Sequence, residues 1–154
     1  TYDPTGFMTS LTDPALAVTA FDKTDLVTTK TDPLGRVTTY VYDKAGRLKT
    51  KTDRKGDVIN YSYTPDNVLQ TITYPDSSTV SFTNDELDRT TSMTDSLGTT
   101  TYLYDDANRT VTVTDPHGFL VVYKHDEAGR LKELTYPGSK KVIYGYVHWA
   151  GWKP

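Results

Sequence analysis

Residues 42–63 read YDKAGRLKTKTDRKGDVINYSY, and most of the remaining sequence consists of weaker copies of this stretch. When the copies are aligned on the aromatic residue at their start, successive copies begin 19 to 22 residues apart. The aligned positions are Tyr2, Phe21, Tyr42, Tyr63, Phe82, Tyr104, His125 and a closing Tyr146. The sequence therefore contains seven units, and self-similarity at such a period indicates a repeat protein.

Each unit carries two turn signals. The first turn has Gly, Asn or Asp at its fifth position, and these residues tolerate a positive φ; in the fifth unit Asp88 is expected to take this place after a bulge or longer loop. The second turn is usually Thr-Asp-x-x-Gly, the residue preference of a type I turn. The predicted structural turn residues are Gly6, Asp32, Gly35, Gly46, Asp53, Gly56, Asn67, Gly98, Asn108, Asp115, Gly118 and Gly129.

The segments between the turns are about six residues long and rich in Thr, Val, Ile and Tyr, which is typical of β-strands. Residues two apart in a strand share one face, so the paired tyrosines predict an aromatic stripe with Leu48 or Leu131 filling its gaps. The predicted ladder comprises Tyr2, Phe21, Tyr40, Tyr42, Tyr61, Tyr63, Phe82, Tyr102, Tyr104, Tyr123, Tyr144 and Tyr146. Arg47, Lys49 and Lys51 alternate along one strand and predict a solvated face. The sequence thus predicts an all-β array of about seven antiparallel hairpins.

The predicted array covers residues 1–146, and a short tail, residues 147–154, follows it. Trp149 and Trp152 lie in this tail and are expected to cap the last hairpin or to form an exposed contact. Because the sequence starts inside a unit, with neither an initial Met nor a signal peptide, we expect it to be a segment of a processed or larger protein.

Composition excludes several classes of function. The net charge of −3 and the pI near 5.5 leave no basic stripe for nucleic acid. No apolar run approaches the roughly 20 residues that span a bilayer, so membrane insertion is not expected. The chain has no cysteine, which excludes disulfides and thiolate metal sites.

No residue pattern predicts catalysis or metal binding. The aspartates, among them Asp43 and Asp53, mostly stand at turn positions, where repetition favours a structural role over a catalytic one. His117, His125 and His148 have no spacing typical of a metal site. No nucleophile elbow, phosphate loop or zincin helix is present. The sequence predicts a protein that is not an enzyme and has no catalytic residue, cofactor or metal.

The pattern Tyr-Asp-x-x-Gly-Arg-Leu, followed by Thr-Asp-x-x-Gly and Tyr-x-Tyr, resembles the YD repeat, also called the Rhs repeat. Residues 42–48 and 125–131 carry it most plainly, and weaker copies cover residues 2–146. The resemblance implies hairpins that form one continuous curled or spiral sheet and close as a hollow shell. In bacterial Rhs proteins, wall-associated relatives and the B–C component of Tc toxins the shell encloses a toxin, and in teneurins a related shell supports adhesion. The aspartyl self-cleavage core of such shells is missing here.

Three functions remain open at this point. The first is a structural stretch of the wall of a secreted or cell-surface bacterial protein that encloses, delivers or displays another domain. Its partners would be flanking repeats of the same chain and an encapsulated toxin domain. The second is a self-associating module that polymerises head to tail through open β-edges into an extracellular fibre or surface layer. The third is carbohydrate binding or adhesion through the tyrosine ladder.

Overall fold

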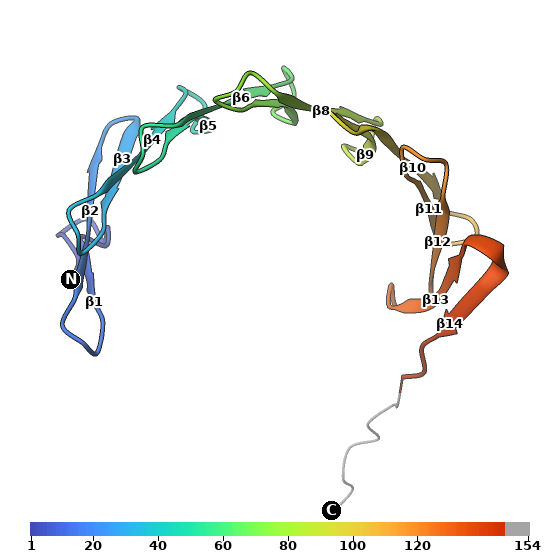
Figure 1. Ribbon diagram of the computed structural model, residues 1–154. Helices are drawn as coiled ribbons and strands as arrows, with labels where there is room; N and C mark the ends of the chain where they lie inside the picture. The colour runs from blue at the N-terminus through green and yellow to red at the C-terminus, as the bar shows by residue number, and fades with distance from the viewer. Residues whose placement is uncertain (147–154) are drawn as a thin grey trace, which may run out of the picture. The chain divides into compact units, whose positions relative to one another are not determined.

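The computed structural model describes residues 1–146, which form fourteen strands that follow one another in chain order (Figure 1). The strands are β1 (Ser10–Thr12), β2 (Val18–Thr24), β3 (Val27–Thr31), β4 (Val37–Tyr42), β5 (Leu48–Thr52), β6 (Val58–Tyr63), β7 (Leu69–Thr73), β8 (Thr79–Asn84), β9 (Thr90–Asp95), β10 (Gly98–Asp105), β11 (Thr110–Thr114), β12 (Leu120–His125), β13 (Leu131–Tyr136) and β14 (Lys140–Ile143). A short 3₁₀ turn, η1 (Pro137–Ser139), is the one helical element of the described residues. The predicted tail with Trp149 and Trp152 lies outside them.

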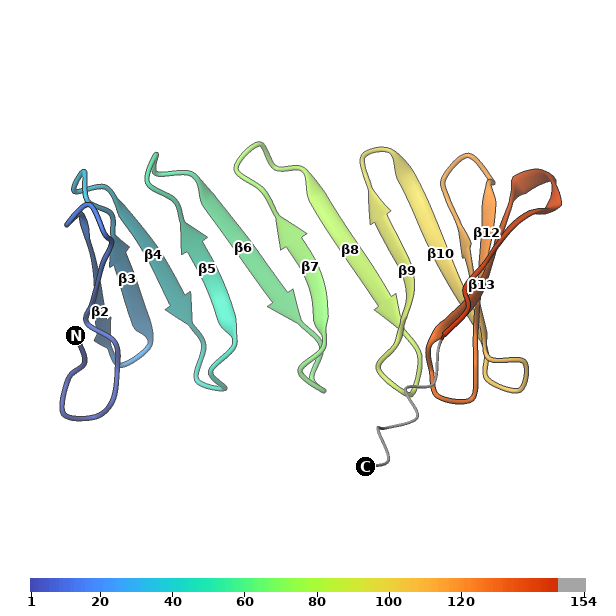
Figure 2. The same cartoon turned by 90° about the horizontal axis from the view of Figure 1, so that it is seen from below.

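The chain divides into two halves, an N-terminal half, Thr1–Ser81, and a C-terminal half that begins at Phe82 within β8. In the N-terminal half every strand from β1 to β8 pairs antiparallel with its neighbour in sequence. In the C-terminal half the strands from β9 to β14 do the same. Figure 2 shows the strands of each half side by side and joined by short turns. The predicted all-β array of antiparallel hairpins is confirmed.

A bulge recurs where the first turn of a unit begins. The register between β4 and β5 shifts after Val41, so that Tyr42 faces Leu48 and Val41 faces Thr50. Lys49 is therefore the extra residue, and its side chain is exposed. Equivalent shifts occur between β6 and β7 and between β12 and β13. A bulge adds one residue to one strand and re-aims its side chains.

This bulge corrects the expectation that Arg47, Lys49 and Lys51 form one solvated face. Arg47 and Lys51 are half-buried, and only Lys49 is exposed. Lys51 lies directly opposite Tyr40, on the tyrosine side of the sheet. Simple alternation fails here because it assumes that no residue is inserted between positions 48 and 51.

The register also corrects the alignment of two units. Phe21 faces Lys30 as Tyr40 faces Lys51, so Phe21 is equivalent to Tyr40 rather than to Tyr42. In the fifth unit the first turn starts at Asp85, directly after Asn84, as another starts at Asp43 directly after Tyr42. Phe82 therefore also stands two residues earlier than the alignment placed it.

The sheet has no second layer of secondary structure in the described residues, and its burial is shallow throughout. Side chains alternate between half-buried and exposed along β6 and β8. Among residues 1–146, Leu134 is the one apolar side chain that is fully buried, with 8% exposed. Stability therefore comes from cross-strand pairs and from neighbouring hairpins, as in other repeat proteins.

Candidate functional site

The first turn of the third unit shows how the repeat sequence builds its hairpin. Gly46 N–H donates to the Asp43 carbonyl over 2.9 Å, and Asp43 N–H donates to the Arg47 carbonyl over 2.9 Å. Gly46 has a φ of +79°. Asp43 Oδ1 accepts the N–H groups of Ala45 and Arg47 over 2.9 and 3.0 Å. This is a three-residue hairpin turn with glycine in the left-handed position, and the aspartate caps its backbone.

The same aspartate fixes the arginine that follows the glycine. Arg47 Nε donates to Asp43 Oδ2 over 2.7 Å. The guanidinium of Arg47 lies 4.8 Å from the ring centre of Tyr63, the tyrosine of the next unit. Tyr63 in turn donates its hydroxyl to the Leu48 carbonyl over 2.8 Å. We name this set of three residues the Asp-Arg-Tyr latch, because it ties one hairpin to the next.

Two further latches lie in the C-terminal half of the chain. Arg89 lies 4.3 Å from the ring centre of Tyr104, whose hydroxyl donates to the Thr90 carbonyl over 2.9 Å. Arg130 lies 4.4 Å from the ring centre of Tyr146, whose hydroxyl donates to the Leu131 carbonyl over 2.6 Å. The aspartates of these latches are Asp85 and Asp126. The same contacts recur in three hairpins, and they explain why the repeat carries Asp, Arg and Tyr at these positions.

The latch lowers the proton affinity of its carboxylate. Hydrogen bonds from the backbone N–H of Arg47 and, against the opposing effect of burial, from its side chain hold the pKa of Asp43 below 3.8, its ordinary value. Burial raises the pKa of Tyr63 above 10.0. At neutral pH the carboxylate is therefore ionised and the phenol is protonated. Both groups are committed to contacts within the latch, which suits a structural role rather than proton transfer.

The predicted turn residues lie in turns or at strand ends, but one prediction of positive φ is wrong. Asn108 does not have it, and Arg109 takes a φ of +54° instead. Asn67 and Asp88 have φ values of +69° and +60°. Positive φ is found at predicted glycines in both turns: Gly6, Gly35, Gly46, Gly56, Gly98, Gly118 and Gly129. Asp32, Asp53 and Asp115 each accept two backbone N–H groups of their own turn.

Besides Arg109, sequence reasoning missed three non-glycine residues with positive φ. Leu16, Ser77 and Ser139 have φ values of +63°, +68° and +61°. All three stand where the second turn of other units has glycine, and the preceding Asp-Pro or Tyr-Pro signal could have located them. The turn geometry is thus imposed by the hairpin even where the residue type does not favour it.

The residues of the predicted aromatic ladder occupy two different positions within their own hairpins. The latch tyrosines Tyr63, Tyr104 and Tyr146 occupy one of these positions. In the other, Tyr40 faces Lys51, Tyr61 faces Ile72 and Tyr102 faces Val113, with Phe21, Phe82, Tyr123 and Tyr144 at equivalent positions. Tyr2 stands apart in an isolated bridge with Met8 and is 71% exposed, whereas Tyr42 faces Leu48. The residues that face these rings are aliphatic or lysine, so the surface of each such hairpin is mixed rather than purely aromatic.

The histidines and acidic residues form no cluster of metal ligands. Within residues 1–146, no three His, Cys, Asp or Glu side chains are grouped so that they could hold a metal ion. His117 lies 4.0 Å from Asp115 in an exposed turn. In the same range, no helix has the length and apolar character needed to cross a membrane.

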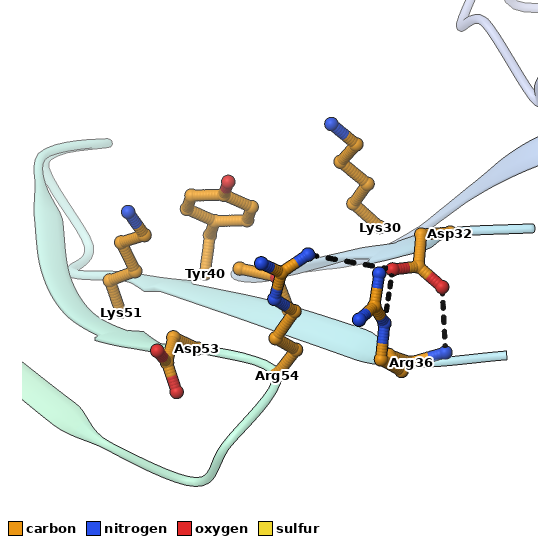
Figure 3. Close-up of a pocket in the computed structure, with 8 residues that line it drawn as sticks. Lys30, Asp32, Arg36, Tyr40, Lys51, Asp53 and Arg54 are labelled. Carbon is orange, nitrogen blue, oxygen red and sulfur yellow. Dashed lines mark hydrogen bonds and ion pairs between the residues drawn. The ribbon is translucent and has the colours of Figure 1, made fainter. Parts of the chain in front are cut away.

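A hollow of about 210 Å³ lies over β3, β4 and β5 in the N-terminal half of the chain (Figure 3). It is lined by Lys30, Asp32, Arg36, Thr38, Tyr40, Lys51, Asp53 and Arg54. Figure 3 shows the ring of Tyr40 standing between Lys51 on one side and Lys30 on the other. This hollow is the candidate binding site of the N-terminal half, because it combines an aromatic ring with several charged groups.

The carboxylates of the hollow are engaged by their own turns. Asp32 accepts Arg36 Nε over 2.7 Å and lies 3.9 Å from Arg54. Although burial opposes the effect, hydrogen bonds from the backbone and side chain of Arg36 lower the pKa of Asp32. The backbone N–H of Lys55 is the main cause of the lowered pKa of Asp53. Both carboxylates are therefore ionised and already hydrogen-bonded at neutral pH.

Three comparisons place this geometry among known proteins. Solved structures with the same fold include the crystal structure of TcdB2-TccC3-TEV, with a TM-score of 0.68 and 18% identity over 97% of this chain. Another is the Photorhabdus luminescens Tc holotoxin pore, with a TM-score of 0.66 and 16% identity over 91% of this chain. The chain spans only 9% of the length of each of those chains. A comparison with curated proteins gives no match.

The family comparison rests on the sequence itself. The profile of the RHS Repeat matches residues 21–58, 42–79, 84–120 and 104–141. Successive matches overlap by one hairpin within each of two stretches, as expected for an array whose period is half the length of the matched segment. These matches cover well over half of the sequence, and the chain belongs to the RHS-repeat family.

Proposed function

We propose that this chain is a non-enzymatic stretch of the β-shell wall of a secreted or cell-surface bacterial RHS-repeat protein. The wall encloses, delivers or displays another domain, such as a toxin. The observation that carries the proposal is the combination of hairpin-to-hairpin latches with a sheet in which Leu134 alone, among the described apolar side chains, is fully buried. Such a sheet is laterally tied but has no core of its own, which suits a wall rather than a globular domain.

The structural likeness supports the same proposal. Nearly the whole chain follows the fold of a short piece of a much longer chain in the TcdB2-TccC3-TEV structure. Repeats of this kind stack on their neighbours, and the terminal repeats need capping or further protein. The partners of the chain would then be flanking repeats of the same polypeptide and the enclosed domain.

The proposal is tested on the native polypeptide isolated from its source. We expect a denatured mass far above 17.2 kDa, hollow particles in negative-stain electron microscopy, and an internal domain that resists protease until the particles are opened. A mass near 17.2 kDa, or particles without a protected domain, would contradict the proposal.

Self-association is the second candidate, and one observation favours it. All four residues of β14 are exposed, and Ile143 is 73% exposed at the edge of the C-terminal half. An exposed edge strand can pair with another chain. If this edge polymerises, Ile143→Lys should abolish concentration-dependent growth in size-exclusion chromatography, whereas Leu103→Lys, in the interior of the sheet, should not. Monomeric behaviour of the parent chain at all concentrations would exclude it.

A further inference from the structure

The hollow around Tyr40 departs from the repeat pattern at the residue that faces the ladder. In later hairpins this residue is aliphatic: Ile72 faces Tyr61, Val113 faces Tyr102 and Leu134 faces Tyr123. In the first two hairpins that show the pattern it is lysine, since Lys30 faces Phe21 and Lys51 faces Tyr40. Two neighbouring hairpins thus have a cation where these three later hairpins have an aliphatic side chain.

The two lysines and the arginines concentrate positive charge in a chain of net charge −3. The lining of the hollow contains four cationic and two anionic side chains. Arg36 is held by Asp32, and Arg54 lies at 3.9 Å from the same carboxylate. Within residues 1–146, neither Lys30 nor Lys51 lies within 4.0 Å of a carboxylate oxygen. The hollow therefore has two ammonium groups available to a ligand.

The ring of Tyr40 adds a second kind of recognition. Tyr40 is half-buried, and its ring stands between the two lysines (Figure 3). The face of an aromatic ring packs against the C–H face of a sugar, and its hydroxyl can hydrogen-bond at the rim. A concave site in which polar groups converge beside an aromatic ring is typical of ligand recognition.

We propose that this hollow binds an acidic sugar, with its carboxylate or sulfate on Lys30 and Lys51 and its ring against Tyr40. The site is local to β3, β4 and β5, whereas the sequence pattern suggested sugar binding along the whole ladder. Phosphate, sulfate and carboxylate share the anion chemistry that the lysines recognise. The tyrosine selects an anion that is attached to a ring.

The experiment is a titration of the 154-residue chain followed by NMR of the lysine side-chain methylenes. The probes are a glucuronate-containing disaccharide, a sulfated disaccharide, a neutral disaccharide of the same size, and inorganic sulfate. We expect shifts at Lys30 and Lys51 with both acidic disaccharides, and an affinity at least tenfold weaker for the neutral disaccharide and for sulfate. The affinity should also fall as salt is raised, because the contact is between exposed charges.

Two variants separate binding from packing. Lys30→Met with Lys51→Met keeps the apolar stems that cover the tyrosine, and we expect at least a tenfold loss of affinity for the acidic disaccharides. Lys44→Met with Lys49→Met changes the net charge equally at two exposed lysines outside the hollow and should leave the affinity unchanged. Tyr40→Leu should weaken the disaccharides but leave the weak binding of sulfate as it is.

Several results would overturn the proposal. These are no shift with either acidic disaccharide at about 10 mM, tenfold above a millimolar Kd, equal binding of the neutral disaccharide, equal binding of free sulfate, or equal losses in the two double-lysine variants. Urea unfolding of each variant shows that its fold is intact. The outcome is independent of whether the chain forms part of a shell.

Discussion

Two sequence segments of equal length form turns of different structure. Residues 42–47 read YDKAGR, and residues 104–109 read YDDANR. In the first, Gly46 has the positive φ and Asp43 holds Arg47. In the second, Asn108 donates its backbone N–H and its side-chain amide to Asp105 over 3.0 and 2.7 Å. Arg109 then takes the positive φ and lies 3.7 Å from Glu127.

The difference shows that aspartate and arginine four residues apart are not sufficient for a latch. The carboxylate of Asp105 is occupied by Asn108 and leaves Arg109 exposed. The ladder residue of the next unit is His125, which lacks a hydroxyl to donate to the preceding strand. A latch thus needs the turn, the carboxylate and the tyrosine together.

The first hairpin shows that the stacking contact can form with its partners exchanged. Phe7 stands at the place of the latch arginine, and Lys23 stands at the place of the latch tyrosine. The ammonium of Lys23 lies 5.9 Å from the ring centre of Phe7. The cation–ring contact depends on the presence of one cation and one ring, whichever strand carries each.

The largest effect is expected when a latch loses its tyrosine. Tyr63→Leu removes the hydroxyl contact to the Leu48 carbonyl and the ring under Arg47, and we expect a loss of about 2–3 kcal/mol. His125→Leu, at the equivalent place without a latch, should cost less than about 1 kcal/mol. Urea unfolding measures both, and equal losses would show that the latch adds no stability.

Gly46→Val should cost about 1–2 kcal/mol, because a β-branched side chain is strained at a φ of +79°. Apart from Gly46 itself and the two residues next to it in the chain, no heavy atom lies within 4 Å of a Cβ built at position 46. The cost is therefore conformational rather than a steric clash with another residue. Arg109→Gly is the converse change and should stabilise by about 0.5–1 kcal/mol. Unchanged melting of Gly46→Val would remove the turn assignment.

A latch can be rebuilt in the exceptional turn. Asn108→Gly restores the residue that favours positive φ, and His125→Tyr supplies the ring and the hydroxyl. We expect the double variant to be about 0.5–1 kcal/mol more stable than the sum of the single changes predicts, because the contacts form only together. Additive effects in a double-mutant cycle would mean that the turn and the tyrosine act independently.

The smallest effect concerns pH. Because the pKa of Asp43 is lower in the folded chain than its ordinary value of 3.8, its contribution to stability is present above that value and is lost as pH falls below it. Asp43→Asn should therefore flatten the fall of the unfolding free energy between about pH 4 and pH 2. Glu127→Gln, which alters a loose ion pair at 3.7 Å, serves as the control. An identical fall in the parent and in Asp43→Asn would contradict the assignment.

The repeat pattern was sufficient to predict the hairpins, because each turn is encoded by a few adjacent residues. Gly46, Gly129 and Asp53 act through their own backbone conformation or through neighbours within four residues. Strand alternation between such turns is equally local. These features follow from covalent geometry and from short-range hydrogen bonds, which sequence patterns record directly.

The bulges and the latch were not accessible from spacing. Alternation placed Lys49 and Lys51 on one face, but the register shift after Val41 separates them. The alignment of Phe21 and Phe82 failed for a related reason, since aromatic identity does not reveal which of two positions in the strand a residue fills. Register is decided by pairing with the neighbouring strand, whose partner residues lie 6 to 13 residues away in the sequence for β4 and β5.

The sequence by itself determined the repeat, the turn chemistry, the β composition and the family of this protein. Only the tertiary structure decided which arginine contacts which tyrosine, and that Lys30 and Lys51 flank Tyr40 in one hollow. The physical reason is the range of the interactions. A turn is closed by residues within one peptide loop, whereas a latch or a binding hollow requires strands from successive hairpins to be brought into register.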